Sequence, residues 1–288
     1  MSTDIKTFTN SLGMKFMDDL KIAAICMRAV PGEIEKNLDR MQSFVFEASK
    51  AGADIVCFPE LCVTGYILTR PLDVYGGLDS ERVMERLAVM AREADLVLIA
   101  GLVESSGDEK PYISQVITGP KGLIGIHRKT HLSPAEKNVY GTGQEIKVFS
   151  HGSATFGVQL CYEAHFPEIS TGMALIGADI VFIPHASPRG EPDEKFKSWL
   201  RHLPARAFDN GMFVVACNQV GKTGAGLAFP GVAVVFGPDG RLLAKYVGKE
   251  EKILFAELGA GMLRDIRTHR MRYFLPERRP ELYKKGDN

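Results

Sequence analysis

Two segments that lie far apart in the chain, 51–60 and 176–185, share the run Gly-Ala-Asp-Ile-Val and then, after two further residues, a proline. In each segment a helical pattern ends near the glycine and a strand-like run follows, which predicts equivalent elements in two halves of one body. The same turn recurs in unrelated α/β proteins because glycine caps helix ends, so capping alone is the alternative. If the halves are equivalent, Glu60 and His185 leave their strands at one rim, where α/β folds usually bind ligands.

The surrounding sequence alternates between strand-like and helical patterns. Residues 21–30 and 53–58 are each typical of a strand, and between them apolar residues recur at helical spacing, which predicts a β-α-β unit. That stripe consists of Ile34, Leu38, Met41, Val45 and Ala48. Further on, the patterns predict helices at 80–94, near 167–176 and at 193–210, a hairpin of 112–118 with 122–127, and strands at 96–103, 155–160, 179–184, 213–219, 231–236 and 241–246.

The alternation continues without a break in composition, which favours one large α/β domain over two. We predict an N-terminal arm at 1–18 and one domain over 19–288, which includes a C-terminal tail from about residue 265. The N-terminus lacks a charged start followed by an apolar core, so no signal peptide is predicted. No run approaches the roughly 20 apolar residues that a membrane helix needs, because Pro230 interrupts the longest candidate, 224–237.

Charge and cysteine content restrict the class of partner. The 35 Lys and Arg residues balance the 35 Asp and Glu residues, so nothing points to nucleic acid or to an anionic membrane, and a small neutral or zwitterionic partner fits better. Five cysteines are an odd number for a disulfide framework, and four of them stand in apolar, strand-like runs. A reducing cytoplasm is therefore the expected compartment.

Three short segments place chemically active side chains directly after predicted strands or hairpins. Glu60 follows a buried strand that breaks at Pro59, Lys129 follows the hairpin, and Cys161 follows the apolar run 155–160. Each also has an ordinary interpretation. A carboxylate after a strand can cap a turn or pair with arginine, a charge run is usually solvated, and a buried thiol can be a small hydrophobe. Position alone does not decide between these interpretations.

Two neighbours of Cys161 suggest a local catalytic pair. His165 lies four residues later, but the partners of catalytic cysteines usually lie far away in sequence, so a structural or specificity role is favoured. Glu163 would point away from Cys161 if the local chain were extended. A metal site is not expected, because His127 and His131 lack further ligands at a recognisable zinc spacing.

The order of three segments narrows the interpretation. They read FPELCVTGY at 58–66, HRKTHLSPAE at 127–136 and VQLCYEAHFPE at 158–168. Glu60, Lys129 and Cys161 are thereby separated by 69 and 32 residues. This order resembles the nitrilase or carbon-nitrogen hydrolase family, whose members use a glutamate, a lysine and a cysteine in the same sequence.

The resemblance extends over nearly the whole chain. Residues 205–221 and 278–283 are similar to further segments of the family, so 19–288 is identified as a single carbon-nitrogen hydrolase domain. The family fold implied is a four-layer αββα sandwich of class α/β, in which helices flank two packed mixed β-sheets. The resemblance also implies that subunits pair through their helical faces into a homodimer or a higher homo-oligomer.

The resemblance implies hydrolysis of a non-peptide carbon–nitrogen bond in a small amide, without a cofactor or a metal. In this scheme Glu60 takes the proton of Cys161, the sulfur attacks the carbonyl carbon, and Lys129 with the backbone N–H of Tyr162 holds the oxyanion. The resulting thioester is hydrolysed to a carboxylate, and ammonia leaves. Glu136 matches a second family glutamate, which lines the pocket and orients the lysine.

The sequence leaves the substrate open. Tyr162 after the cysteine favours an amide over a nitrile, since resembling nitrilases usually carry tryptophan at that position. The alternatives are an N-carbamoyl amine or amino acid, a nitrile, or a catalytically idle binding role. The loop 185–192 lies where related enzymes place specificity residues, so His185, Arg189 and Glu191 are candidate substrate contacts. Arg189 would suit a carboxylate and Glu191 an ammonium group.

Overall fold

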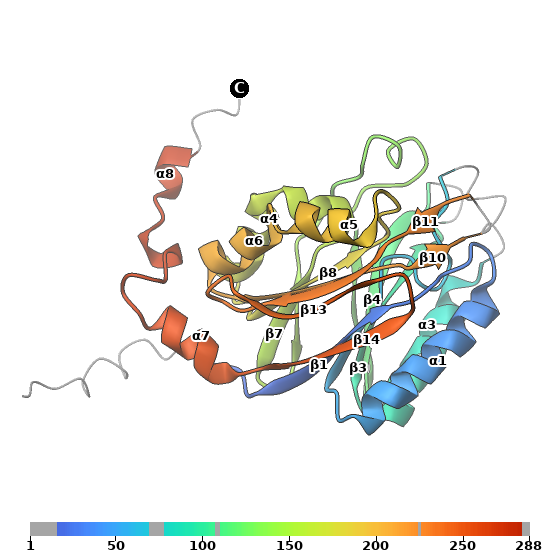
Figure 1. Cartoon of the computed structure of the whole chain (residues 1–288), viewed down its shortest axis with the longest axis horizontal. Coiled ribbons are helices and arrows are strands. Elements are labelled where there is room, and N and C mark those ends of the chain that lie inside the picture. Colours follow the sequence, from blue (N-terminus) through green and yellow to red (C-terminus); the bar gives the residue numbers. More distant parts are fainter. Residues whose placement is uncertain (1–15, 69–77, 107–109, 224–225, 284–288) are drawn as a thin grey trace, which may run out of the picture.

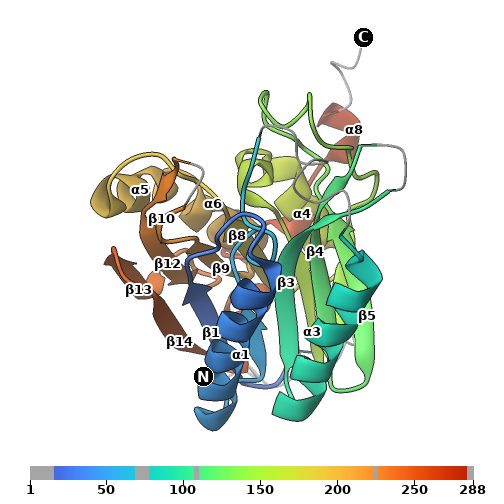
Figure 2. The ribbon, with the colours of Figure 1, turned by 90° about the vertical axis from the view of Figure 1, so that its right-hand side faces the viewer.

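The computed structural model describes residues 16–68, 78–106, 110–223 and 226–283. Two mixed sheets of six strands lie face to face, and helices cover the outer face of each (Figures 1 and 2). Apolar side chains fill three interfaces, one between the sheets and one beneath each helical layer. The expected four-layer αββα sandwich is confirmed.

The first sheet has the strand order β14-β1-β2-β3-β4-β5. Its strands are β1 (Leu20–Cys26), β2 (Ile55–Cys57), β3 (Val97–Glu104), β4 (Tyr112–Gly119), β5 (Gly122–Arg128) and β14 (Lys252–Leu258). Helices α1 (Ile34–Lys50) and α3 (Ser80–Ala94) pack on its outer face through one apolar side each. For α1 this side contains the predicted stripe, because residues spaced by three or four share one face of a helix.

The second sheet has the strand order β13-β12-β9-β8-β7-β6. Its strands are β6 (Val148–His151), β7 (Ala154–Val158), β8 (Ile180–His185), β9 (Phe213–Asn218), β12 (Gly231–Phe236) and β13 (Leu242–Gly248). Helices α4 (Pro167–Leu175), α5 (Pro192–Trp199) and α6 (Leu203–Asn210) cover it. The prediction of a single helix over 193–210 is wrong. Helix α5 ends at Trp199, and a new helix begins at Leu203. Pro204, which cannot donate a backbone hydrogen bond, lies in the first turn of α6, where no such bond is needed.

The two sheets repeat one topology. From one edge of each sheet to the other, the order β14-β1-β2-β3-β4-β5 corresponds to β6-β7-β8-β9-β12-β13. Neighbouring strands have the same parallel or antiparallel pairing in both sheets. β2 and β8 hold the same place, and each follows a helix that ends beside Gly52 or Gly177, both with positive φ. The shared Gly-Ala-Asp-Ile-Val run therefore marks equivalent elements, which confirms the two-halved body.

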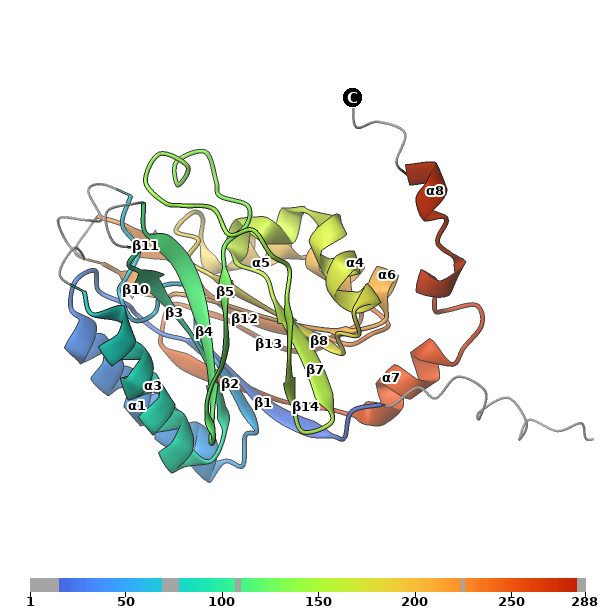
Figure 3. The ribbon, with the colours of Figure 1, turned by 180° about the vertical axis from the view of Figure 1, so that it is seen from behind.

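The patterns missed the edge strands β6 and β14. β14 comes from near the C-terminus and pairs antiparallel with β1, so that Leu20 lies opposite Leu258 and Cys26 opposite Lys252. After it, α7 (Ala260–Arg267), a 3-10 turn at Leu275–Glu277 and α8 (Pro280–Tyr283) lead away from the sandwich (Figures 1 and 3). Two further short strands, β10 (Gly221–Lys222) and β11 (Ala228–Phe229), pair with each other outside the two large sheets.

Most of the predicted arm 1–18 lies outside the described residues. Within the described part of the chain, no helix has the length and apolar content to span a bilayer.

Candidate active site

Glu60, Lys129 and Cys161 come together at one rim of the sandwich, each shortly after a strand. Glu60 follows β2, Lys129 follows β5, and Cys161 begins a 3-10 helix, Cys161–His165, beyond β7. Lys129 Nζ donates to Glu60 Oε1 at 2.7 Å, and both residues are buried. The cluster thus combines groups from both sheets.

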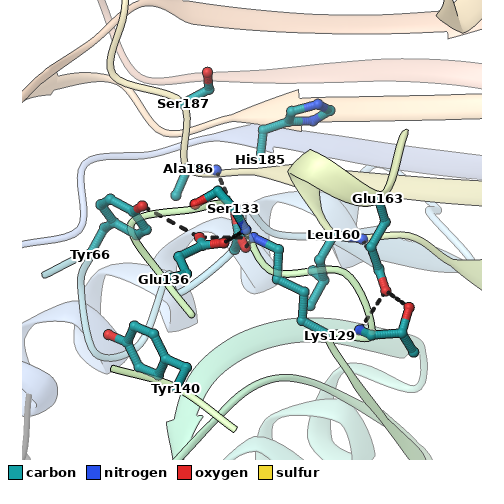
Figure 4. Close-up of polar contacts among 12 residues, drawn as sticks. Tyr66, Lys129, Ser133, Glu136, Tyr140, Leu160, Glu163, His185, Ala186 and Ser187 are labelled. Carbon is teal, nitrogen blue, oxygen red and sulfur yellow. Dashed lines mark hydrogen bonds and ion pairs between the residues drawn. The ribbon is translucent and has the colours of Figure 1, made fainter. Parts of the chain in front are cut away.

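Glu136 holds Lys129 from a second side. Its Oε1 accepts from Lys129 Nζ at 2.9 Å and from the Tyr66 hydroxyl at 3.3 Å, while its Oε2 accepts from the backbone N–H of Ser133 at 2.8 Å (Figure 4). Burial alone would lower the pKa of Lys129, but Glu60 and Glu136 raise it well above its ordinary range. The ammonium is therefore charged at neutral pH and fixed between two carboxylates.

Glu60 is also held from the second half of the sandwich. Its Oε2 accepts from the backbone N–H of Ala186 at 2.9 Å, directly after β8 (Figure 4). The ends of β2 and β8 thus meet at one rim, as the repeated run predicted. Burial raises the pKa of Glu60, although Lys129 opposes the shift. A carboxylate with a raised pKa is a better proton acceptor than a solvated one.

Cys161 stands on a strained turn and keeps its proton in the resting protein. Its φ is +45°, in the left-handed region that L residues rarely adopt. It is partly exposed, whereas Cys26, Cys57, Cys62 and Cys217 are buried free thiols. Burial of the sulfur raises the pKa of the Cys161 thiol, Glu60 raises it further, and Lys129 opposes them. A nucleophilic thiolate would therefore need a base at the moment of attack, and Glu60 is the nearby carboxylate with a raised pKa.

Glu163 joins the cysteine turn to the lysine segment. The local chain is helical and not extended, so the premise for its pointing away does not hold. Its completely buried carboxylate contacts His127 Nε2 at 2.9 Å. It also accepts from the backbone N–H of Thr130 at 2.7 Å and from that of Leu160 (Figure 4). Leu160 precedes Cys161 and Thr130 follows Lys129. One side chain therefore fixes the spacing of two candidate catalytic groups.

The pKa of Glu163 makes this connection testable by pH. Burial alone would raise this pKa, but His127 and the hydrogen bonds from Leu160 and Thr130 lower it from 4.5 to about 2. A depressed folded-state pKa gives stability that is present above the unfolded-state pKa of about 4.3 and is lost as the pH falls toward 2. Ionised Glu163 thus stabilises the fold at neutral pH, by on the order of 3 kcal/mol.

We expect Glu163→Gln to lower the free energy of unfolding at pH 7 by on the order of 3 kcal/mol, and the difference from wild type to shrink between about pH 4 and pH 2. Urea denaturation over a pH series measures it. Glu168→Gln, which alters an exposed carboxylate on α4, serves as the control and should change stability little. A difference that stays constant from pH 7 to the acid limit would contradict the assignment.

A cavity of about 390 Å³ opens beside Cys161. Its wall includes the end of β8, the loop that follows it, and α5. The predicted contacts His185 and Arg189 both line it. His185 is buried, its ring lies 4.3 Å from that of Trp199, and its Nδ1 lies 2.7 Å from the carbonyl oxygen of Ile183. Burial lowers the pKa of His185 well below its ordinary value.

The structure places the other predicted site residues differently. Glu191 does not line this cavity, and its carboxylate forms an ion pair of 2.8 Å with Lys249. His165 does line it, where its ring stacks on that of His202 at 4.7 Å and touches the ring of Tyr162. His127 and His131 face different partners, since His127 contacts Glu163 while His131 Nδ1 contacts the Thr130 hydroxyl and its ring packs against Phe166.

One wall of the cavity was not predicted. Side chains of α5 and the turn after it line this wall, namely Glu194, Lys195, Ser198, Trp199 and His202. Their spacing of three and four residues is that of a single helical face. The spacing was visible in the sequence, but nothing in the sequence indicated that this face turns toward Cys161.

Comparisons with known proteins find relatives of similar sequence and similar fold. The family model "Carbon-nitrogen hydrolase" matches residues 21–268. A nitrilase of Pyrococcus abyssi is 31% identical over 268 residues, which cover 92% of this chain and 99% of the relative. An N-carbamoylputrescine amidase of Arabidopsis thaliana is 28% identical over 276 residues, which cover 89% and 91%. Among solved structures, an amidase mutant from Nesterenkonia sp. AN1, with acrylamide added at its active-site cysteine, has a TM-score of 0.79 and 28% identity, covering 92% of this chain and 98% of that one.

Proposed function

The chain belongs to the carbon-nitrogen hydrolase family, and on that basis we propose that it hydrolyses a small amide through a thioester on Cys161. Amidases among the relatives support amide hydrolysis as the reaction. The observation that carries the proposal is the buried ammonium of Lys129, which donates to Glu60 at 2.7 Å and to Glu136 at 2.9 Å. It lies at the rim of the sandwich where Cys161 follows β7. Burying these charges carries a desolvation penalty that their pairing offsets only in part, and such clusters of perturbed groups are concentrated at functional sites.

In the proposed first half-reaction Glu60 removes the thiol proton as the sulfur bonds to the carbonyl carbon. The carbonyl oxygen becomes an oxyanion, which Lys129 and the backbone N–H of Tyr162 stabilise. An ammonium nitrogen has three protons, and Lys129 donates two of them to Glu60 and Glu136, which leaves one for the oxyanion. Glu60 then returns its proton to the nitrogen, the carbon–nitrogen bond breaks, and ammonia leaves.

The second half-reaction releases the acid. Glu60 takes a proton from water as the water oxygen bonds to the thioester carbon, and the same donors hold the new oxyanion. The carbon–sulfur bond breaks, and the proton on Glu60 passes to the sulfur. The product acid loses its remaining proton to solvent and departs as a carboxylate, and Cys161 is again a thiol. In this scheme Glu136 positions Lys129 and does not exchange protons with the substrate.

An amide fits better than a nitrile on the basis of Tyr162, with N-carbamoyl amines or amino acids as the second candidate. A panel tests this directly by measuring ammonia release from short aliphatic amides, ω-amides of dicarboxylates, N-carbamoyl compounds and nitriles. We expect turnover of at least one class of amide. Turnover of nitriles alone would overturn the amide assignment, and turnover of carbamoyl compounds alone would select the second candidate.

Cysteine labelling tests the nucleophile separately from the substrate. We expect iodoacetamide to modify Cys161 first, because the other four thiols are buried, and we expect an amide substrate to protect it. Because the pKa of the thiol is raised, the labelling rate should increase with pH above neutrality. Peptide mass mapping identifies the labelled residue. Equal reactivity of all five thiols would instead favour the catalytically idle alternative.

We also propose a homodimer or higher homo-oligomer in the cytoplasm. Large apolar side chains stay exposed at the end of α4, on α6 and in the C-terminal segment, namely Leu175, Ile176, Phe208, Met271 and Phe274. These residues support pairing through the outer helical layer, since large exposed apolar side chains favour association. Five free thiols support a reducing compartment.

A further inference from the structure

Lys195 brings to the cavity a positive charge that is not in an ion pair with any carboxylate of the described residues. The residue lies on α5 and is 8% exposed, and its Nζ donates to Ser187 Oγ at 2.6 Å. No Asp or Glu among the described residues forms an ion pair with this ammonium. Burial lowers the pKa of Lys195, while Cys161 opposes the shift. A buried ammonium that donates to one hydroxyl and forms no ion pair with a described residue is suited to receive an anion.

The described part of the wall carries one further positive charge, on Arg189, and one negative charge, on Glu194. Arg189 is exposed at the cavity rim. Glu194 carries the one carboxylate among the described lining residues. Its Oε2 accepts from the backbone N–H of Glu191 at 3.0 Å, at the start of α5. The lining histidines are His165, His185 and His202. Burial lowers the pKa of each, that of His202 to about 4, so they are predominantly neutral above pH 7.

We propose that Lys195, assisted by Arg189, binds a carboxylate of the substrate, so that the amide hydrolysed here carries an anionic group at the end opposite the reacting carbonyl. This proposal rests on the proposed amide hydrolysis at Cys161. The ammonium supplies a charge-assisted hydrogen bond in a site shielded from water, which is stronger than the same contact on an exposed surface. Arg189 contributes a second cation at the opening.

The carboxylate site is rigidly connected to the reacting groups. Ser187, which receives the Lys195 hydrogen bond, follows Ala186, whose N–H binds Glu60. Asn218 fixes the Ser187 backbone from both sides, accepting its N–H at 2.9 Å and donating to its carbonyl at 3.1 Å. A cavity of about 390 Å³ is near the small end of ligand pockets. The substrate class is therefore a short dicarboxylic acid monoamide.

Two other roles for this wall give different results. Lys195 could serve only to hold the Ser187 loop, in which case its removal would impair every substrate by the same factor. Glu194 could instead attract a cationic substrate, since it lines the same cavity. The charge of the substrate separates all three roles, because size and amide chemistry can be kept constant while the charge changes.

Three matched amides provide this test. Succinamate, butyramide and 3-aminopropanamide share an amide and a two-methylene spacer and end in a carboxylate, a methyl and an ammonium group respectively. We expect kcat/KM for succinamate to exceed that for butyramide by about 10-fold or more, in line with a hydrogen bond to a charged group. Glutaramate and pentanamide repeat the comparison with one more methylene.

Variants locate the effect. Lys195→Met removes the ammonium but keeps most of the unbranched side chain, and it should lower kcat/KM for succinamate by about 10- to 100-fold while leaving butyramide within about threefold. Lys197→Met, an exposed lysine on the same helix, is the matched control and should change neither. Arg189→Gln removes an exposed charge that cannot disturb the core, and should selectively weaken succinamate by about threefold or more even if Lys195→Met fails to fold.

Several results would overturn the proposal. These are equal kcat/KM for succinamate and butyramide, a preference for 3-aminopropanamide, or equal losses for all three amides in Lys195→Met. Calorimetry on Cys161→Ala separates this failure from failure of the proposed reaction, since binding needs no turnover. Succinamate should bind that variant at least about 10-fold more tightly than butyramide, a preference that Lys195→Met removes. If this preference holds but wild-type protein releases no ammonia from any amide, the reaction is wrong and the anion site stands.

Discussion

Cys161→Ala should abolish amide hydrolysis, with kcat falling by about 10⁴-fold or more, because the proposed thioester forms on the sulfur that this substitution removes. The fold should survive, since the residue is partly exposed and alanine is smaller than cysteine. Ammonia release measures the first expectation and the melting temperature the second. Under a slowly hydrolysed amide, mass spectrometry should detect the acyl group on wild-type protein and none on the variant.

The matched control for this substitution is Cys26→Ala, which removes a thiol buried in β1. It should reduce stability modestly, as small core truncations do, and leave kcat unchanged. The nucleophile assignment fails if Cys161→Ala keeps more than about 1% of wild-type kcat, because a 10²-fold loss is what one missing oxyanion donor alone can cause. Retained acylation at another residue would have the same meaning.

Lys129→Met should combine a catalytic loss with a loss of stability. Without the ammonium, oxyanion stabilisation is weakened, which typically costs about 10²- to 10³-fold in kcat. Glu60 and Glu136 would also remain buried without their shared counter-ion, and breaking a buried ion pair costs about 3–5 kcal/mol. Part of this penalty would be relieved by protonation of one carboxylate, so the stability difference should narrow at acid pH.

The control for Lys129→Met is Lys121→Met, which removes an exposed lysine from the turn of the same hairpin. It should alter neither kcat nor the midpoint of urea unfolding appreciably. Lys129→Arg tests geometry at constant charge, and we expect it to stay impaired because the planar guanidinium is too large for the space between the two carboxylates. Full stability of Lys129→Met at neutral pH would show that the two carboxylates do not depend on this ammonium.

The catalytic candidates could be predicted because each has a local signal. Glu60 and Cys161 end buried apolar runs, and the chain turns sharply at both places, with positive φ at Leu61 and at Cys161. Lys129 follows a hairpin whose turn is visible in the sequence. The order of the three segments then indicated the family, and the resemblance to that family implied the fold. The repeated run predicted in addition that Glu60 and His185 lie at one rim of the sandwich.

Features that depend on remote partners could not be predicted. Glu163 is fixed by His127 and Thr130, which lie on another segment, and no periodicity relates them to it. The α5 wall has a helical spacing, but which way that face turns depends on how α5 packs on the second sheet. Glu191 was expected at the substrate, yet it stands just before α5 and pairs with Lys249.

The pairing of β1 with β14 has a consequence for synthesis of the chain. β1 emerges from the ribosome long before its neighbour at the sheet edge, Lys252–Leu258, because most of the described chain lies between the two strands. Until then the edge of β1 has unpaired N–H and C=O groups, which are open to mispairing with other chains. Because such long-range contacts form slowly, the nascent protein should be most prone to aggregation in the interval before β14 is released, and a chaperone that covers β1 would be most useful at that stage.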